Sequence, residues 1–230
     1  MSKKVKQVKR QSVKLNKFII PTIFSLNKKE FDLKLKKLVS VSKNLQVDFM
    51  DGGFVKSTSV LPRFVPDLSF FKNNVFEAHL MVRDPVSFFD KIKSKGFKKI
   101  IFHIESFNNF DLALNFYNFL KKQKIIPVVA INPDTRISNK LVSSFDFFLL
   151  MGVRPGLEKQ ALIKSTYKRI EKIKLLNPGA RVQIDGGVNI KTISKLFKSG
   201  ADFVNSGSFI SESDNPELAL NDLCEAIKEV

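Results

Sequence analysis

The sequence predicts an α/β fold, a single (β/α)₈ TIM barrel. Eight short apolar runs alternate with amphipathic helical patterns, at a spacing of about 20 to 35 residues that suits one strand–helix unit. The length of 230 residues suits one such barrel. Alternating strands and helices favour a parallel sheet, and eight repeats favour its closure into a barrel. The pattern alone leaves an open doubly wound sheet as the alternative.

The eight expected strands are short runs rich in Val, Ile, Leu and Phe. They cover residues 18–24, 45–49, 75–81, 99–104, 126–131, 145–151, 181–184 and 203–205. Helical patterns fill the intervals, at 29–41, 85–95, 109–124, 160–176, 190–199 and 216–229, with at most a short helix over 138–144. Pro85 and Gly96 frame the second helix, because proline favours a helix start and glycine a helix end.

The net charge of +17 is unevenly distributed. Residues 1–17 carry seven basic side chains and no acidic one, so this segment contributes +7 and residues 18–230 contribute +10. We expect residues 1–17 to form a basic flexible N-terminal tail and residues 18–230 to form the barrel domain. Most lysines of the domain fall on the polar faces of predicted helices, which is typical of a solvated surface. Such a surface would still attract phosphorylated substrates.

Several locations and partners are disfavoured. No run of 18 apolar residues occurs, so we expect no membrane span, and no apolar segment follows the basic N-terminus as in a signal peptide. The only cysteine, Cys224, cannot form an internal disulfide. A chain without disulfides fits the reducing cytoplasm, where we expect the protein to act.

Polar residues and glycines follow the predicted strands. In a (β/α)₈ barrel the active site forms at the carboxyl ends of the strands, so these residues are candidates for a site. Seven of the 10 glycines fall there, where a backbone can approach a ligand closely or take a positive φ. They are Gly52, Gly53, Gly152, Gly156, Gly186, Gly187 and Gly207. Ordinary tight turns explain one or two such glycines better than they explain seven.

Two carboxylates provide the sharper signal. Asp48 and Asp185 end the second and seventh strands, and both point inward if the strand pleat follows the flanking apolar residues. A carboxylate facing the barrel mouth is costly unless it is paired, hydrogen-bonded or bound to a metal. His79 ends the third strand, so these three side chains could hold a divalent metal. Each has an ordinary structural explanation when taken singly, but their convergence favours a functional site.

Methionines and a second group of strand ends complete the candidate site. Met50, Met81 and Met151 would form an apolar wall that excludes water, although methionines more often fill a core. The residues after strands seven and eight match the phosphate site of such barrels, with simple turns as the alternative. The expected phosphate-binding residues are Gly186, Gly187, Gly207 and Ser208.

The strand-end motifs follow one another in a recognisable order. They are Pro-Thr-Ile-Phe-Ser at 21–25, Val-Asp-Phe-Met-Asp-Gly at 47–52, His-Leu-Met at 79–81, His-Ile-Glu at 103–105, Asn-Pro at 132–133, Asp-Gly-Gly-Val-Asn at 185–189 and Gly-Ser at 207–208. In order and spacing they resemble ribulose-phosphate 3-epimerase from about residue 18 to residue 212. The Asp-x-Met-Asp-Gly, His-Leu-Met and Asp-Gly-Gly series is specific, whereas Asp-Gly-Gly and Gly-Ser alone occur in many phosphate-binding barrels.

The resemblance implies a barrel of the ribulose-phosphate-binding type and a reaction of the pentose phosphate pathway. By resemblance, the enzyme interconverts D-ribulose 5-phosphate and D-xylulose 5-phosphate by two-base proton transfer at C3 through a metal-stabilised enediolate. Asp48 and Asp185 are then the catalytic acid and base on opposite faces of the substrate. One divalent metal ion (Zn, Fe, Mn or Co) is held by Gln46, Asp48, His79 and Asp185. The implied substrate-binding residues are Thr22, Met50, His79, Met81, Met151, Gly156, Gly186, Gly187, Gly207 and Ser208.

The sequence also departs from the family pattern. The family has histidine two residues before the first aspartate, and this chain has Gln46, whose amide oxygen is a poorer zinc ligand than imidazole. Gly53 stands where histidine is usual, and Thr22 where serine is usual. The family loop Asn-Pro-Gly-Phe-Gly-Gly reads Arg-Pro-Gly-Leu-Glu-Lys at 154–159, so two glycines are lost. Both acids remain, but the metal and phosphate sites are altered.

Three alternatives stay open. The chain could epimerise another ketose phosphate, such as allulose 6-phosphate, with the same two acids. It could be a degenerate phosphate-binding barrel without turnover. It could bind nucleic acid through residues 1–17, an interaction that we do not favour. The expected partner is a small-molecule sugar phosphate with no membrane partner, and homo-oligomer formation is left open.

Overall fold

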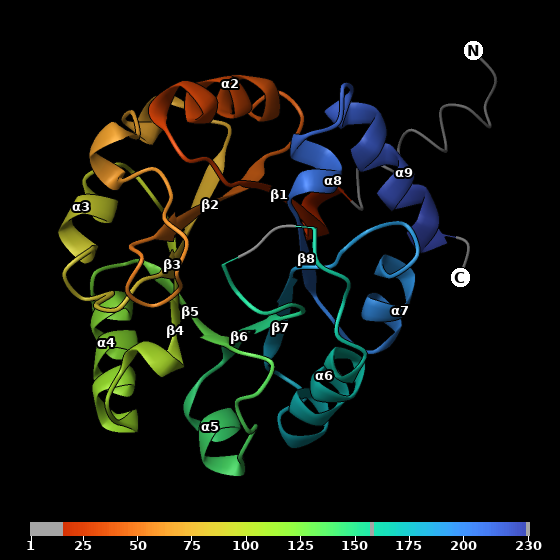
Figure 1. Ribbon diagram of the computed structural model, residues 1–230. Coiled ribbons are helices and arrows are strands. Elements are labelled where there is room, and N and C mark those ends of the chain that lie inside the picture. Colours follow the sequence, from red (N-terminus) through yellow and green to blue (C-terminus); the bar gives the residue numbers. More distant parts are fainter. Residues whose placement is uncertain (1–15, 157–158, 229–230) are drawn as a thin grey trace.

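The computed structural model describes residues 16–156 and 159–228, and these form a closed parallel barrel. The strands are β1 (Ile19–Ile23), β2 (Asn44–Met50), β3 (Val75–Met81), β4 (Lys99–His103), β5 (Ile126–Ile131), β6 (Phe147–Met151), β7 (Arg181–Asp185) and β8 (Phe203–Ser206). Each strand pairs with the next in the sequence, and β8 pairs with β1. The predicted (β/α)₈ barrel is therefore confirmed (Figure 1).

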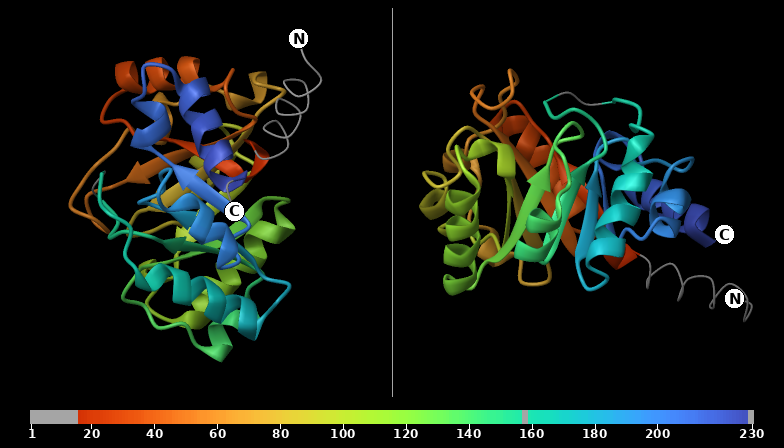
Figure 2. Two further views of the ribbon diagram at one scale, coloured as in Figure 1. Left: turned by 90° about the vertical axis from the view of Figure 1, so that its right-hand side faces the viewer. Right: turned by 90° about the horizontal axis from the view of Figure 1, so that it is seen from below.

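Helices surround the barrel on its outside (Figures 1 and 2). They are α2 (Lys28–Leu38), α3 (Phe89–Lys93), α4 (Phe110–Lys122), α5 (Asn139–Ser144), α6 (Ser165–Leu176), α7 (Ile193–Lys198), α8 (Ser208–Ser211) and α9 (Pro216–Lys228). Short 3₁₀ turns lie at Asn16–Phe18, Pro62–Phe64, Leu68–Phe70 and Ile104–Ser106. Side chains of Asn27, Asn109 and Ser138 cap the first turns of α2, α4 and α5 by accepting backbone N–H bonds.

One helix starts later than its sequence suggests. The pattern predicts a helix from Pro85, but α3 begins at Phe89. The Asp84 side chain accepts the backbone N–H groups of Val86 and Ser87, and Phe88 N–H bonds to Pro85 O in an i to i+3 turn. The Asp84 bonds are those of a helix N-cap, but the first turn closes through i to i+3 bonds, including Phe89 N–H to Val86 O, so regular α-helix begins only after it.

The predicted tail of residues 1–17 lies almost wholly outside the described residues. The described chain begins with the 3₁₀ turn Asn16–Phe18, next to the last helix. Cys224 of α9 is buried, and its thiol donates to Asn16 Oδ1 at 2.8 Å. In the part of the chain that the structure describes, no helix has the length and apolar character needed to cross a membrane.

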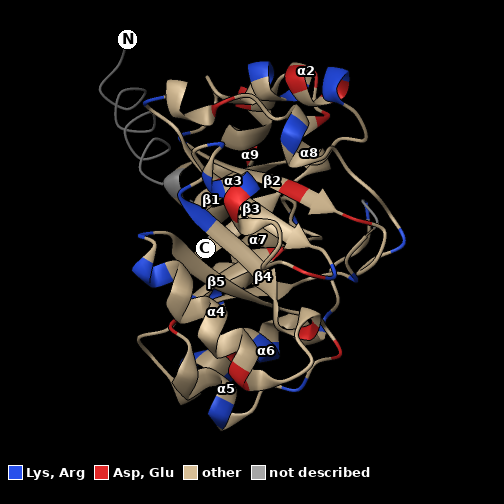
Figure 3. Ribbon diagram, turned by 90° about the vertical axis from the view of Figure 1, so that its left-hand side faces the viewer, with Lys and Arg blue, Asp and Glu red and all other residues tan. Residues whose placement is uncertain are grey.

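The charged side chains of the domain are dispersed over the outer helices. Figure 3 shows Lys and Arg on α2, α5 and α6. Acidic residues accompany them on α2, at Glu30 and Asp32, and on α6, at Glu171. Ion pairs join several of them, including Lys28 to Asp32 within α2 and Lys34 to Glu30 at 2.8 Å. Exposed pairs of this kind contribute little stability. The basic excess of this face is therefore a dispersed field with no single concentrated patch.

The barrel interior is divided into an apolar and a polar half. Strands β4 to β6 supply a fully buried apolar cluster. Its members are Ile101, Val128, Ala130, Phe147, Leu149, Met151 and Val153. The other strands bring inward-facing polar side chains together, most of them with almost no exposed surface. These are Gln46, Asp48, Glu77, His79, Gln183, Asp185 and Asn205.

A buried ion pair closes the amino-terminal end of this polar half. Lys99 Nζ lies 2.5 Å from Glu77 Oε2, and the two residues are neighbours in the β3–β4 register. The ammonium group also lies 5.0 Å from the ring centre of Phe147 and 5.5 Å from that of Phe203. Both ions are removed from water, so each depends on the other for charge compensation.

We expect Lys99→Met to destabilise the protein strongly, because it leaves Glu77 buried without its counter-ion. Breaking a buried pair in this way costs about 3–5 kcal/mol. Lys98→Met removes an exposed lysine from the adjacent position and should change stability by about 0.5 kcal/mol or less. Chemical denaturation of both variants measures the difference. Equal stability of the two variants would contradict a structural role for the pair.

Candidate active site

A cavity of about 400 Å³ opens at the carboxyl ends of the strands. Most of the predicted site residues line it. They are Thr22, Asp48, Met50, Met81, Met151, Gly156, Asp185, Gly186, Gly187, Gly207 and Ser208. Gln46 and His79 do not reach the cavity surface, because both are fully buried among the barrel side chains. The strand-end positions thus converge as expected, with two residues lying one layer deeper.

Asp48, His79 and Asp185 form the polar centre of the site. The β2–β3 register places Asp48 beside His79, and β7 brings Asp185 to the same end of the barrel. His79 Nδ1 lies 3.3 Å from Asp48 Oδ1 and 3.1 Å from Asp185 Oδ2. One nitrogen and two carboxylate oxygens lie within 4.8 Å of one another, as potential ligands of one metal ion do.

Burial and mutual charge shift the pKa values of this centre. Burial raises the pKa of Asp48, the negative charge of Asp185 raises it further, and the hydrogen bonds from His79 and Gln46 oppose both, leaving a pKa of about 6. Burial lowers the pKa of His79, but the two adjacent carboxylates outweigh it and raise the pKa to about 9. The imidazolium is thus the cation that compensates the two acids.

The side chain of Gln46 occupies the middle of this centre. Its Nε2 atom lies 2.9 Å from Asp48 Oδ1 and 2.7 Å from Asp185 Oδ2. The same atom lies 3.4 Å from His79 Nδ1 and 3.5 Å from Thr22 Oγ1. The amide nitrogen, a donor, therefore faces the acids. A metal ligand would present the amide oxygen instead.

His103 supports His79 from behind. The two Nε2 atoms are 2.9 Å apart, and the rings stack with centroids 5.1 Å apart. Burial lowers the pKa of His103, which favours its neutral form, and a neutral ring can accept a hydrogen bond from His79 through Nε2. His103 Nδ1 lies 3.4 Å from Glu105 Oε2, and the Phe54 ring covers His103 at 4.7 Å. These neighbours orient His79 with Nδ1 toward the acids.

The His103–Glu105 pair received no role from the sequence, although its motif marks the end of the fourth strand. Glu105 also accepts the Asn132 backbone N–H at 2.8 Å and the hydroxyl of Thr135. The carboxylate thereby joins the loops after β4 and β5. Asn205 was missed for a different reason, because a single polar residue inside a short apolar strand has no distinctive pattern.

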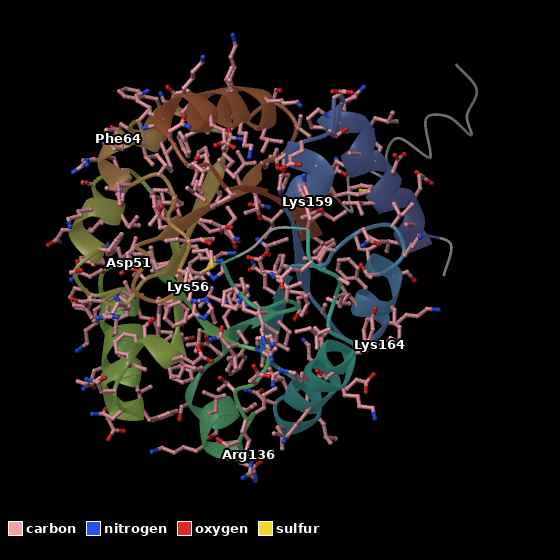
Figure 4. All side chains as sticks on the ribbon, viewed as in Figure 1. Asp51, Lys56, Phe64, Arg136, Lys159 and Lys164 are labelled. Atoms are coloured by element: carbon pink, nitrogen blue, oxygen red, sulfur yellow. The ribbon has the colours of Figure 1, made fainter. Side chains whose placement is uncertain are left out.

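Asp51 lies three residues after Asp48 but has a different role. Its carboxylate accepts the backbone N–H groups of Gly53 at 2.8 Å, Phe54 at 3.1 Å and Arg83 at 2.8 Å. Burial raises its pKa, and these bonds outweigh burial and lower it. Asp51, labelled in Figure 4, therefore holds the loops after β2 and β3 together and keeps its charge.

The described residues of the altered loop, 154–156 and 159, lie at the mouth of the cavity, and residues 157–158 are outside the described part. Pro155, Gly156 and Lys159 line the cavity. The hydroxyl of Ser57, in the loop after β2, donates to Gly156 O. On the other side Lys159 Nζ lies 2.8 Å from the carboxylate of Glu212, just beyond α8 (Figure 4). The loop is thus attached to both sides of the mouth.

Arg154 does not contribute to the cavity. Its guanidinium lies 3.2 Å from Asp134 Oδ2, and both side chains are largely exposed. Of the two basic residues that this loop has gained, only Lys159 faces the cavity, and its charge is shared with Glu212.

Glycines after β6 and β7 allow the two loops to pack closely. Gly152 N–H donates to Asp185 O at 2.6 Å, and a Cβ on Gly152 would lie 2.3 Å from Gly186 O. Gly187 has a φ of 72°, and a Cβ there would lie 2.6 Å from the Leu162 backbone. These glycines are thus required by packing, and this packing shapes the wall that they present to the cavity.

Comparison with known proteins identifies the family. The sequence model described as the ribulose-phosphate 3 epimerase family matches residues 18–211. The chain belongs to this family. The resemblance inferred from the strand-end motifs is therefore confirmed, and the protein is an isomerase of the epimerase type.

Named relatives agree with this assignment. Ribulose-phosphate 3-epimerase of Helicobacter pylori (strain J99) is 31% identical over 207 residues, which cover 86% of this chain and 94% of that protein. The enzyme of the same name from Encephalitozoon cuniculi is 27% identical over 182 residues, covering 79% of this chain and 81% of that protein. The relationship thus spans nearly the whole barrel.

Solved structures support the fold. A 3-hexulose-6-phosphate synthase superposes with a TM-score of 0.68 at 14% identity, covering 91% of this chain and 99% of that chain. Orotidine 5′-phosphate decarboxylase from Pyrococcus horikoshii OT3 gives a TM-score of 0.63 at 14% identity, covering 92% and 100%. At this identity the likeness concerns the barrel alone.

We expect Gly152→Ala to destabilise the fold, because its Cβ would collide with the Gly186 carbonyl. Overpacking of this kind costs about 1–3 kcal/mol. Gly179→Ala is the matched control, since a Cβ there would meet only Asn177 Oδ1 at 3.5 Å. Thermal unfolding of both variants measures the effect. An unchanged Tm for Gly152→Ala would show that the loops after β6 and β7 can separate freely.

Proposed function

We propose that the protein interconverts D-ribulose 5-phosphate and D-xylulose 5-phosphate by moving the proton at C3. The proposal depends on one observation: Asp48 and Asp185, from strands β2 and β7, line one cavity small enough for a single sugar phosphate. Family membership supports the reaction type. Inverting a carbon next to a carbonyl requires one group to remove the proton and another to deliver a proton to the opposite face.

In this proposal the two aspartates take those roles. Neither side chain is ion-paired to Lys or Arg among the described residues. His79 and Gln46 contact Asp48 Oδ1 and Asp185 Oδ2, so the second oxygen of each carboxylate stays available to a substrate. His79 and Gln46 hold them from below, which restricts their motion and orients them toward the cavity. The apolar side chains of Met50, Met81 and Met151 line the same cavity and would exclude water from the reacting carbon.

The donor set fits a divalent metal ion. Two carboxylate oxygens and an imidazole nitrogen converge in a buried place, and two buried carboxylates require nearby positive charge. We propose that Asp48, His79 and Asp185 hold one ion of Zn, Fe, Mn or Co. When bound, such an ion would stabilise the negative charge that develops on the substrate oxygen as C3 loses its proton.

The substrate phosphate is proposed to lie at the opposite side of the cavity. Residues of the loops after β7 and β8, including Ser208, line that side together with Lys159, whose ammonium is paired with Glu212. The proposed phosphate-binding residues are Gly186, Gly187, Gly207 and Ser208. Thr22 and Gly156 are assigned to the sugar, because both line the space between the acids and these loops.

The proposed reaction belongs to the pentose phosphate pathway, and we assign the enzyme to the cytoplasm. The reduced and buried Cys224 is compatible with that compartment. We further propose that residues 18–230 act as one domain, with the basic residues 1–17 as an appendage.

Isotope exchange tests the function. The protein is incubated with ribulose 5-phosphate in deuterated water, without metal and with Mn²⁺, Fe²⁺, Co²⁺ or Zn²⁺. Deuterium at C3 together with xylulose 5-phosphate is the expected result. Exchange only with allulose 6-phosphate would replace the pentulose by a hexulose substrate. Binding of either ester without exchange under every metal condition would refute epimerisation.

Replacing either acid by its amide should abolish the reaction. Asp48→Asn and Asp185→Asn each remove one acid/base group, and we expect kcat to fall by at least about 10²–10⁴-fold while the fold persists. Asp111→Asn, at an exposed position on α4, serves as the control and should retain full activity. Kinetic assays and circular dichroism of the three variants provide the measurement. Near-normal turnover of either site variant would exclude two-base transfer.

A further inference from the structure

A buried row of amides lies beneath the two acids, and the proposal above uses only its first member, Gln46, which contacts both acids. Gln46, Asn205 and Gln183 are each at most 1% exposed, and they come from β2, β8 and β7. Three hydrogen-bonded amides in a barrel interior are costly unless every donor and acceptor is matched. The hydrogen-bond partners of these three amides therefore indicate the role of the row.

The upper end of the row meets the acids. The Gln46 amino group donates one hydrogen bond to Asp48 at 2.9 Å and one to Asp185 at 2.7 Å. Its carbonyl oxygen points the other way and accepts from Asn205 Nδ2 at 2.8 Å. Both hydrogens of the Gln46 amide are thereby used, one on each acid.

The lower end of the row meets the ion pair. Asn205 Nδ2 also donates to Glu77 Oε1 at 3.1 Å, and Asn205 Oδ1 accepts from Gln183 Nε2 at 2.6 Å. Gln183 Nε2 donates its other hydrogen to Glu77 Oε1 at 2.5 Å. Lys99 Nζ lies 3.5 Å from Gln183 Oε1 and 2.5 Å from Glu77 Oε2. Every amide hydrogen in the row has one acceptor.

This row can be hydrogen-bonded in one direction only. If the Gln46 amide turned over, its nitrogen would face the donor Asn205 Nδ2. If the Asn205 amide turned over in response, its oxygen would face the carboxylate of Glu77, which has no proton to donate. Glu77 is itself held by Lys99. The Glu77–Lys99 ion pair cannot exchange its donor and acceptor atoms in this way. Rotating the amides therefore leaves at least two donors, or two acceptors, facing each other.

We propose that Gln46 is a positioning residue whose amino group clamps the two acids, in an orientation set by the Glu77–Lys99 ion pair. The amides of Gln183 and Asn205 transmit this orientation across the barrel. The clamp keeps Asp48 and Asp185 converged in the metal-free protein. It also turns the Gln46 oxygen away, so Gln46 is not a metal ligand, and a metal ion binds in competition with the clamp.

The inference concerns the proposed metal site but does not depend on the proposed reaction, since metal binding is measured without substrate. Asn205→Leu removes the donor that holds the Gln46 oxygen and keeps a side chain of similar shape. The amide is then free to turn its oxygen toward a metal. With Asn205 present, the turned amide would place its nitrogen against the donor Asn205 Nδ2. Removing this donor–donor contact predicts that the affinity for Co²⁺ rises by about tenfold or more. Titration calorimetry on the metal-free protein provides the dissociation constant.

A double-variant cycle isolates the amide. In a Gln46→Leu background no amide remains to be oriented, so adding Asn205→Leu should leave the Co²⁺ affinity unchanged. A gain confined to the background that contains Gln46 supports the clamp, because general loosening of the barrel would weaken metal binding in both. Unchanged or weaker Co²⁺ binding by Asn205→Leu, or an equal gain in the Gln46→Leu background, overturns it.

A measurement on the unmutated protein decides the case if Asn205→Leu does not fold. Nuclear Overhauser effects from the Gln46 side-chain NH₂ protons should reach His79 and Thr22 in the metal-free protein. Effects that instead connect these protons to the Asn205 side chain, with none to His79, would show the amide reversed and would overturn the proposal.

Discussion

Two carboxylates held side by side away from water are the constraint on which the rest of this structure depends. Asp48 and Asp185 repel each other, and the low dielectric of the barrel makes that repulsion costly. The protein answers with a protonated imidazole from His79 and both hydrogens of one amide. The imidazole and the amide need hydrogen-bond partners of their own. Buried polar side chains therefore continue from the mouth through one side of the barrel interior.

The division of that interior follows from this requirement. Polar groups on β2, β3, β7 and β8 satisfy one another down to Glu77, which pairs with Lys99 of β4, while the remaining inward-facing side chains of β4 to β6 supply an apolar cluster. The apolar half contributes burial and close packing, which hold the strands in register. Directional hydrogen bonds in the polar half then fix individual side chains. A site that must hold two carboxylate groups on opposite sides of one substrate carbon benefits from the close packing and from the hydrogen bonds.

The sequence predicted the parts of the molecule that follow periodic patterns. Alternating runs and helices defined the barrel, and strand ends located Asp48, His79 and Asp185 because all parallel strands end at one face. The buried polar residues Glu77, Gln183 and Asn205 were not predicted. Single polar residues within apolar strands show no distinctive pattern, and only closure of the barrel brings them together. Similarly, the sequence around Pro85 shows helical spacing, but the first turn there closes through i to i+3 backbone bonds, a difference that hydrophobic periodicity does not distinguish.

The hydrogen bond between Asn205 and Gln46 also bears on how such a site can change over generations. An amide at position 46 needs a donor beneath it, whereas a histidine there, as the family pattern has it, presents different atoms to the same neighbour. A histidine that bound a metal through one ring nitrogen would turn its other N–H toward the donor Asn205 Nδ2, so we expect the residue at position 205 to change together with residue 46. Residues of the barrel interior would then vary together with the residues at its mouth.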